Sequence, residues 1–185
     1  IREKILEAVD MIADPVKQTL SPKGGNVIYQ DGNSIQNTND GVTIARAISS
    51  SDPIKDAFLT LIKQSSLKTN MEAGDGTTTT ILFTQALIKE GLKLIDEGVN
   101  PIDLKKGLEQ ASDNLIARIK DQAIKITNDK ELINVATISA NNDRKIAEEV
   151  VDVVKFAGED GMVFIENNNK IETEIQKEPG FMMNQ

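Results

Sequence analysis

Residues 73–80, Ala-Gly-Asp-Gly-Thr-Thr-Thr-Thr, place one acidic side chain and two glycines where a helical pattern opens with a row of hydroxyls. The start of a helix leaves backbone N–H groups unpaired and partly positive, so it attracts phosphate oxygens. Asp75 would repel phosphate unless a cation lay between them, and its carboxylate suits Mg²⁺. The segment predicts a nucleoside triphosphate at the helix start, with Mg²⁺ on Asp75. A plain N-cap is the alternative, because Asp and Thr cap helices routinely.

The residue composition limits the other chemistry open to the chain. Its 185 residues include no cysteine and no histidine, which excludes thiolate nucleophiles, disulfides, zinc–thiolate sites and serine triads. Any reaction must therefore use carboxylates, hydroxyls, lysines or backbone groups. The 29 acidic and 21 basic residues give a net charge of −8, so the chain should repel nucleic acid and anionic membranes.

The hydrophobic content favours a helical protein. Hydrophobic residues make up 39% of the chain but aromatic residues only 3%, so the core must consist of Ile, Leu, Val and Ala, which favours packed helices. No secretory signal or transmembrane run is visible in the sequence. We therefore expect a soluble cytoplasmic protein, with an organelle matrix or an infected host cell as further locations.

Apolar residues at three- and four-residue spacing predict helices over most of the chain. Pro15 either kinks the first helix or starts a second one. In the helix that begins at Pro53, the predicted apolar face consists of Ile54, Ala57, Phe58, Leu61 and Ile62. The predicted helices cover residues 1–20, 42–48, 53–70, 77–98, 101–120, 129–139 and 143–156.

Short strand-like runs separated by turn residues predict two β-hairpins, and the last of these runs alternates at Ile171, Thr173, Ile175 and Lys177. The first pairs residues 26–30 with residues 34–37 around an Asp-Gly-Asn turn, and the second pairs residues 162–166 with residues 171–177. The predicted fold class is mainly α, a helical bundle with a small β-hairpin, followed by a small α+β segment.

Five sequence motifs carry a resemblance to a known family. They are T-L-S-P-K-G at 19–24, N-T-N-D-G-V at 37–42, A-G-D-G-T-T-T at 73–79, G-V-N-P-I-D-L-K-K-G at 98–107 and A-T-I-S-A-N-N-D at 136–143. In this order and spacing, the chain resembles the group I chaperonins, the GroEL-like family, over nearly its whole length. The resemblance implies a subunit of a ring-shaped ATPase that encloses unfolded polypeptide and releases it after ATP hydrolysis.

The resemblance also implies a division into domains. Residues 1–121 correspond to the N-terminal part of the equatorial ATP-binding domain and residues 122–177 to the N-terminal part of the intermediate domain. Residues 178–185 correspond to the start of the apical domain, with Gly180 matching the hinge glycine of the family. We expect the chain to be part of something longer, because the returning halves of these domains lie outside it.

The family's nucleotide site maps onto three loops of this sequence. Asp75 corresponds to the Mg²⁺ ligand, and Asp40 to one of two carboxylates near the γ-phosphate, the second lying outside this chain. Asn39 lies in the same nucleotide loop as Asp40, beside an expected K⁺ site. The remaining predicted nucleotide-binding residues are Thr19, Leu20, Ser21 and Pro22 along the phosphates and Gly76, Thr77, Thr78 and Thr79 as the phosphate cradle.

The function that the resemblance implies is ATP-dependent protein folding by a homo-oligomeric ring, with ATP, Mg²⁺ and K⁺, unfolded clients and a co-chaperonin lid. A non-catalytic ring or scaffold subunit is an alternative, because Ser21 stands where the family usually has glycine and Asn39 where it usually has lysine. A stand-alone nucleotide-dependent phosphotransferase is a further alternative, although the sequence offers no motif for a substrate-side base.

Overall fold

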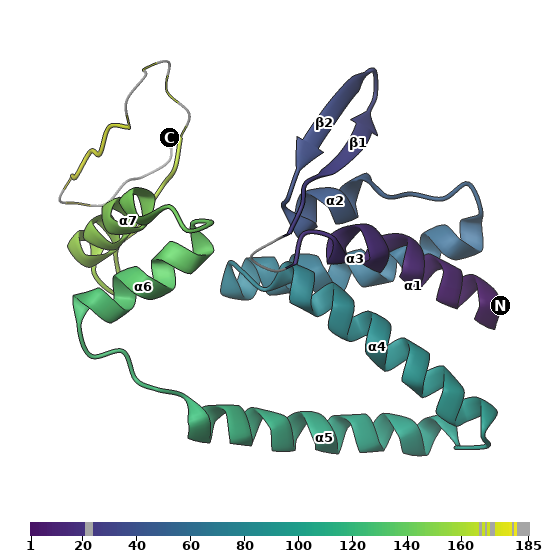
Figure 1. Cartoon of the computed structure of the whole chain (residues 1–185). Helices are drawn as coiled ribbons and strands as arrows, with labels where there is room; N and C mark the ends of the chain where they lie inside the picture. The colour runs from purple at the N-terminus through teal and green to yellow at the C-terminus, as the bar shows by residue number, and fades with distance from the viewer. Residues whose placement is uncertain (21–23, 167, 169, 171–172, 179, 181–185) are drawn as a thin grey trace. The chain divides into compact units, whose positions relative to one another are not determined.

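Seven helices and one antiparallel hairpin make up the described part of this computed structural model, residues 1–20, 24–166, 168, 170, 173–178 and 180 (Figure 1). The mainly helical fold with a small hairpin is as predicted from the sequence. The chain divides into two compact units, Ile1–Arg118 and Ile119–Gln185. The elements are α1 (Arg2–Lys17), β1 (Val27–Asp31), β2 (Ser34–Thr38), α2 (Gly41–Ala47), α3 (Pro53–Ala73), α4 (Thr77–Asp96), α5 (Pro101–Gln122), α6 (Asp129–Ser139) and α7 (Arg144–Ala157).

The core of the first unit lies where α1, α3 and α4 pack together, with α2 against them. Its buried side chains recur at helical spacing along α1, as the sequence predicts. Pro15 lies within α1, which continues to Lys17, so the alternative of a second helix starting there is wrong. The core residues are Ala8, Val9, Ile12, Ala13, Val16, Ile44, Ala45, Leu59, Ile62 and Ile81.

The buried face of α3 includes the predicted Ile62, with Phe58 packed against the core, but it differs from the prediction at other positions. Leu59 is fully buried, whereas Leu61 is 59% exposed and lines an open apolar groove of about 290 Å³ between α1, α3 and α4. Residues 57–59 and 61–62 are all apolar, so apolar side chains occur on several sides of this helix and their spacing does not select one face. The packing of α1 and α4 selects it instead.

Asp52 joins the starts of two helices. Its carboxylate caps α3 by accepting the backbone N–H groups of Ile54 at 2.9 Å and Lys55 at 3.4 Å, as the Asp-Pro pair predicts. It also accepts a hydrogen bond from the Lys4 ammonium of α1, with 2.6 Å between Lys4 Nζ and Asp52 Oδ2. The side-chain hydrogen bond from Lys4, aided by the backbone amides, lowers the pKa of Asp52 against the opposing effect of burial.

Acidification should therefore weaken the first unit through Asp52. A lowered folded-state pKa means that the unfolded chain binds the proton more readily, so the stabilisation is present above the ordinary Asp pKa of about 4 and is lost below it. We expect the midpoint temperature of thermal unfolding to decrease when the pH is lowered from about 5 to about 3. The decrease should be smaller in Asp52→Asn, which keeps the cap. Circular dichroism melts at both pH values measure this, and identical losses in the two proteins would contradict it.

The hairpin precedes α2 and contacts it through β1, as Figure 1 shows. Its strands pair from Val27 with Thr38 to Asp31 with Ser34. Gly32 in the turn has φ +59°, a left-handed conformation that glycine adopts without strain. The first predicted hairpin is thus present in its expected place.

The second unit contains α6 and α7, which pack against each other. Asn128 caps α6 through Glu131 N–H, and Asp143 caps α7 through Ile146 N–H. The predicted second hairpin is wrong in the described residues, because neither 162–166 nor 173–178 forms a strand, while residues 171–172 lie outside them. Phe164 and Ile165 are 61% and 91% exposed, and a two-stranded hairpin without a packing partner is marginally stable.

No residue of α5 is buried over its whole length. Within the described residues, no helix is both long enough and apolar enough to cross a membrane. The assignment of residues 1–121, 122–177 and 178–185 to three domains remains a prediction. So does the hinge role of Gly180, whose φ of +146° lies in the region that favours glycine.

Candidate nucleotide-binding site

The loop between α3 and α4 depends on two left-handed glycines. Gly74, with φ +73°, ends α3 by donating its N–H to the Asn70 carbonyl at 2.9 Å, and Gly76, with φ +84°, is the N-cap residue of α4. Both conformations are strained for residues with a side chain. The chain therefore passes from one long helix into the next through three residues.

The start of α4 lacks a side-chain cap from its own N-cap residue, because Gly76 has no side chain. The described N-caps of α2, α3, α6 and α7 differ, since each accepts backbone N–H groups through a side-chain oxygen. Asp75 is exposed beside this start, and its Oδ1 accepts the Gly76 N–H at 2.6 Å. A carboxylate thus lies beside the backbone N–H groups at the N-terminus of α4.

The hydroxyls that follow have different roles in packing. Thr77 is 8% exposed, and its carbonyl accepts the buried Ser66 hydroxyl of α3 at 3.4 Å. The Thr80 hydroxyl contacts the Thr69 hydroxyl at 3.1 Å and the Gly76 carbonyl at 3.0 Å. These bonds fix the first turn of α4 against α3. Thr78 is partly exposed and Thr79 exposed, so these two hydroxyls are the more accessible.

Asp40 is the N-cap residue of α2. Its Oδ1 accepts Val42 N–H at 3.4 Å, and its Oδ2 accepts both the N–H and the hydroxyl of Thr43, at 2.9 and 2.5 Å. The Asp40 N–H in turn donates to the Thr38 hydroxyl at 3.1 Å. These bonds hold an exposed carboxylate in a defined orientation, with Asn39, also exposed, just before it.

Two of the three predicted loops come together in the first unit. Gly41, which follows Asp40, packs directly against Thr78 in the first turn of α4. The structure therefore places the Asp40 segment beside the threonine row, although 36 residues lie between Gly41 and Thr78 in the sequence. This adjacency is required if both segments serve one ligand.

The first predicted loop is described only at its start. Thr19 donates its N–H and its hydroxyl to the Val16 carbonyl, at 3.1 and 2.8 Å, and Leu20 is 48% exposed. Ser21 and Pro22 lie outside the described residues. Both Thr19 donors thus serve the end of α1, and a phosphate that bound Thr19 would have to replace the Val16 carbonyl.

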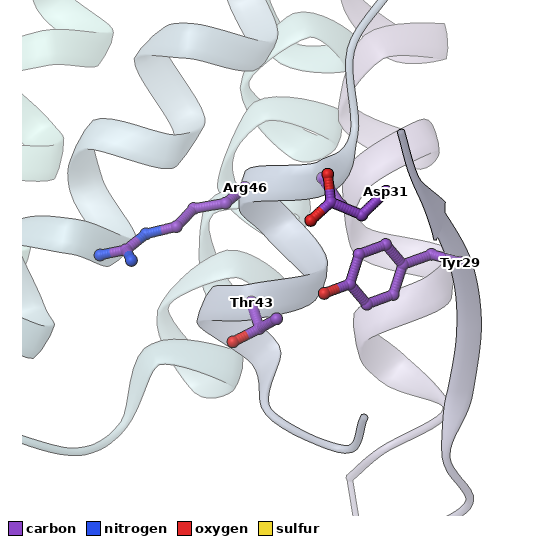
Figure 2. Close-up of a pocket in the computed structure, with 5 residues that line it drawn as sticks. Tyr29, Asp31, Thr43 and Arg46 are labelled. Atoms are coloured by element: carbon purple, nitrogen blue, oxygen red, sulfur yellow. The ribbon is translucent and has the colours of Figure 1, made fainter. Parts of the chain in front are cut away.

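An open pocket of about 240 Å³ lies between β1 and α2, lined by Tyr29, Asp31, Thr43, Arg46 and Ala47. Figure 2 shows the Tyr29 hydroxyl directed toward Thr43, whereas the Arg46 side chain extends away from Asp31. None of the residues that line this pocket was predicted to bind phosphate, and no sequence motif indicates Tyr29 or Arg46. The pocket adjoins the predicted site through Thr43, whose hydroxyl donates a hydrogen bond to the Asp40 carboxylate.

The donor set suits Mg²⁺ held largely by a nucleotide. In the described residues, no group of three or more acidic side chains gathers into a metal site. Mg²⁺ is commonly held by one or two carboxylates together with phosphate and water oxygens. Asp75 beside the start of α4 fits this arrangement.

Comparisons with known proteins agree on one family. The sequence profile of the TCP-1/cpn60 chaperonin family matches residues 12–183. The chain resembles the chaperonin gp146 from the bacteriophage EL 2 (Pseudomonas aeruginosa), crystallised in the presence of ATP-BeFx, with 32% identity and a TM-score of 0.70 over 82% of this chain and 27% of that one. It also resembles a group III chaperonin in the open state, with 28% identity and a TM-score of 0.70 over 82% of this chain and 31% of that one.

The chain thus spans less than a third of the length of these solved chaperonins. The family profile nevertheless covers both compact units, and the helical fold with its small hairpin is the one that these chaperonins share. This chain belongs to the TCP-1/cpn60 chaperonin family.

Proposed function

We propose that this chain is the nucleotide-binding part of a chaperonin subunit that hydrolyses ATP and uses the energy to fold proteins within a ring. The observation that carries the proposal is the start of α4, where the N-cap residue Gly76 supplies no side-chain cap and the Asp75 carboxylate lies beside the first turn. Such a start binds phosphate, and a chaperonin in the same family was crystallised with ATP-BeFx.

The predicted residues at the start of α4 and at the start of α2 have distinct chemical roles in this proposal. The first amides of α4, with the Thr78 and Thr79 hydroxyls, would hold the phosphates, and Asp75 would hold Mg²⁺. Mg²⁺, when bound, neutralises charge on the phosphate oxygens. Asp40, oriented by its bonds to Val42 and Thr43, would orient the attacking water.

The same proposal extends to the rest of the protein. It includes a homo-oligomeric ring in the cytoplasm, unfolded clients, K⁺ near Asn39, and movement of an apical domain about Gly180. It also includes membership of group I, for which the five motifs are the support. Refolding of a client that depends on an added co-chaperonin lid would support group I, and lid-independent refolding would contradict it.

A non-catalytic ring subunit is the second candidate. Two observations favour it: Asn39 brings no positive charge to the predicted site, and the Thr19 donors are bonded to the Val16 carbonyl. Such a subunit would bind nucleotide or assemble without hydrolysing ATP. The phosphotransferase alternative has no comparable support.

Turnover by the full-length protein separates these functions. We expect Mg²⁺-dependent ATP hydrolysis that EDTA abolishes and that falls on the order of 10²-fold in Asp40→Asn, a substitution that keeps a capping side chain. Ring assembly without hydrolysis would favour the non-catalytic subunit. Hydrolysis that is unchanged in Asp40→Asn would contradict the role given to Asp40.

A further inference from the structure

Gly41 is the first residue of α2 and is buried. It is not among the described glycines with positive φ. It is needed for space instead. A Cβ at this position would lie 3.4 Å from both Cα and Cβ of Thr78 and would overlap the Thr78 hydroxyl oxygen, closer than the 3.0 Å that real Cβ atoms keep. The start of α2 thus contacts the first turn of α4 because Gly41 has no side chain.

The helix α2 is fixed along its length and at its end. Ile44 and Ala45 are each only 2% exposed within the core. The Lys63 ammonium of α3 donates to the backbone carbonyls of Ile48 and Arg46 at the end of α2. A lysine at this position satisfies carbonyls that a helix end leaves unpaired. The whole helix cannot slide away from α4 without breaking these contacts.

The first turn of α4 is fixed as well. The Ser66 hydroxyl holds the Thr77 carbonyl, and the Thr69 and Thr80 hydroxyls contact each other, so α3 supports this turn from two positions. A methyl group added at Gly41 would therefore act on the two movable parts that remain. These are the Thr78 hydroxyl and the chain segment at the very start of α2, which carries Asp40.

We propose that Gly41 is a positioning residue that sets the separation between Asp40 and the first turn of α4, an inference that rests on the proposed ATPase function. An added methyl group would move Asp40 by on the order of 1 Å, a displacement that can cost about 100-fold in rate. Phosphate binding would change less, because only the Thr78 hydroxyl is displaced while the amides of α4 and the Thr79 hydroxyl remain in place.

The test uses the full-length protein and five variants. We expect Gly41→Ala to lower kcat by about 10- to 100-fold while the KM for ATP changes by less than about 3-fold. Thr78→Ala removes the overlapping oxygen, so Gly41→Ala/Thr78→Ala should match the kcat of Thr78→Ala alone. Gly107→Ala on α5, where a Cβ meets nothing within 4 Å, is the matched control and should retain the parent kcat.

Two results would overturn the inference. One is a kcat of Gly41→Ala equal to that of the parent protein. The other is that Gly41→Ala lowers kcat by the same factor in the parent protein and in Thr78→Ala. If Gly41→Ala does not fold by circular dichroism, the double variant carries the test through its comparison with Thr78→Ala. Asp40→Asn separates the two proposals. If it lowers turnover and Gly41→Ala does not, only the inference fails, and if it leaves turnover unchanged, the proposed role of Asp40 fails.

Discussion

Replacing Asp75 by asparagine should reduce ATP turnover by the full-length protein on the order of 10²- to 10³-fold, because a metal ligand supports several kcal/mol of charge stabilisation. The substituted amide keeps an oxygen that can accept the Gly76 N–H, which Asp75 accepts at 2.6 Å, so the loop should stay folded. Turnover is measured against Mg²⁺ concentration, and the half-saturating concentration should rise together with the fall in rate.

Asp113→Asn is the matched control for this prediction. Asp113 is an exposed aspartate on α5, a helix without a buried residue, so its loss changes the net charge equally but leaves the loop intact. Equal turnover in Asp75→Asn and Asp113→Asn would contradict the role of Asp75 as the Mg²⁺ ligand. A loss of turnover that excess Mg²⁺ fully restores would show that Asp75 contributes metal affinity alone.

Leu59→Ala should lower the free energy of unfolding of the first unit by about 2–5 kcal/mol, the usual cost of a Leu→Ala cavity in a core. Leu59 is fully buried between α1, α3 and α4. Leu61→Ala is the matched control on the same helix and should cost less than about 0.5 kcal/mol, because Leu61 is 59% exposed. Urea unfolding of the 185-residue chain, followed by circular dichroism, measures both, and equal losses would contradict the assigned core face.

Most of the helices could be predicted because their boundaries are encoded locally. Asp52 and Pro53 start α3 where the sequence predicts, and Asp143 starts α7 in the same way. Such signals act within three residues of the helix start. The first hairpin was predictable for the same reason, since Gly32 supplies its turn.

The failures concern contacts that no local pattern encodes. The buried face of α3 was predicted through Leu61 because apolar residues surround that part of the helix, and only the packing of its neighbours selects Leu59. Residues 162–166, Met-Val-Phe-Ile-Glu, are typical of a strand in composition, but their side chains are exposed and they form no strand. Strand formation depends on such packing partners more than on the segment itself.

The residues assigned to the candidate site remain a prediction, and their arrangement in space could not be predicted from the sequence. The sequence indicates Asp40 and residues 75–79 as parts of one site, yet the contact between Gly41 and Thr78 that joins them is visible only in three dimensions. The burial of Thr77 was also unexpected, because it removes one hydroxyl of the row from the surface. Side-chain caps and glycine turns are readable from sequence, whereas helix-to-helix distances are not.

The chain contains one tyrosine and no tryptophan, and that tyrosine lies against α2 in the pocket of Figure 2. Its intrinsic fluorescence therefore comes almost entirely from one ring, whose hydroxyl is directed toward Thr43. Any shift of α2 relative to β1 would change the polarity around Tyr29. Within this chain, the predicted catalytic carboxylate thus has an optical reporter beside it, and stopped-flow tyrosine emission from the 185-residue chain would test the proposed binding of a nucleotide without a label.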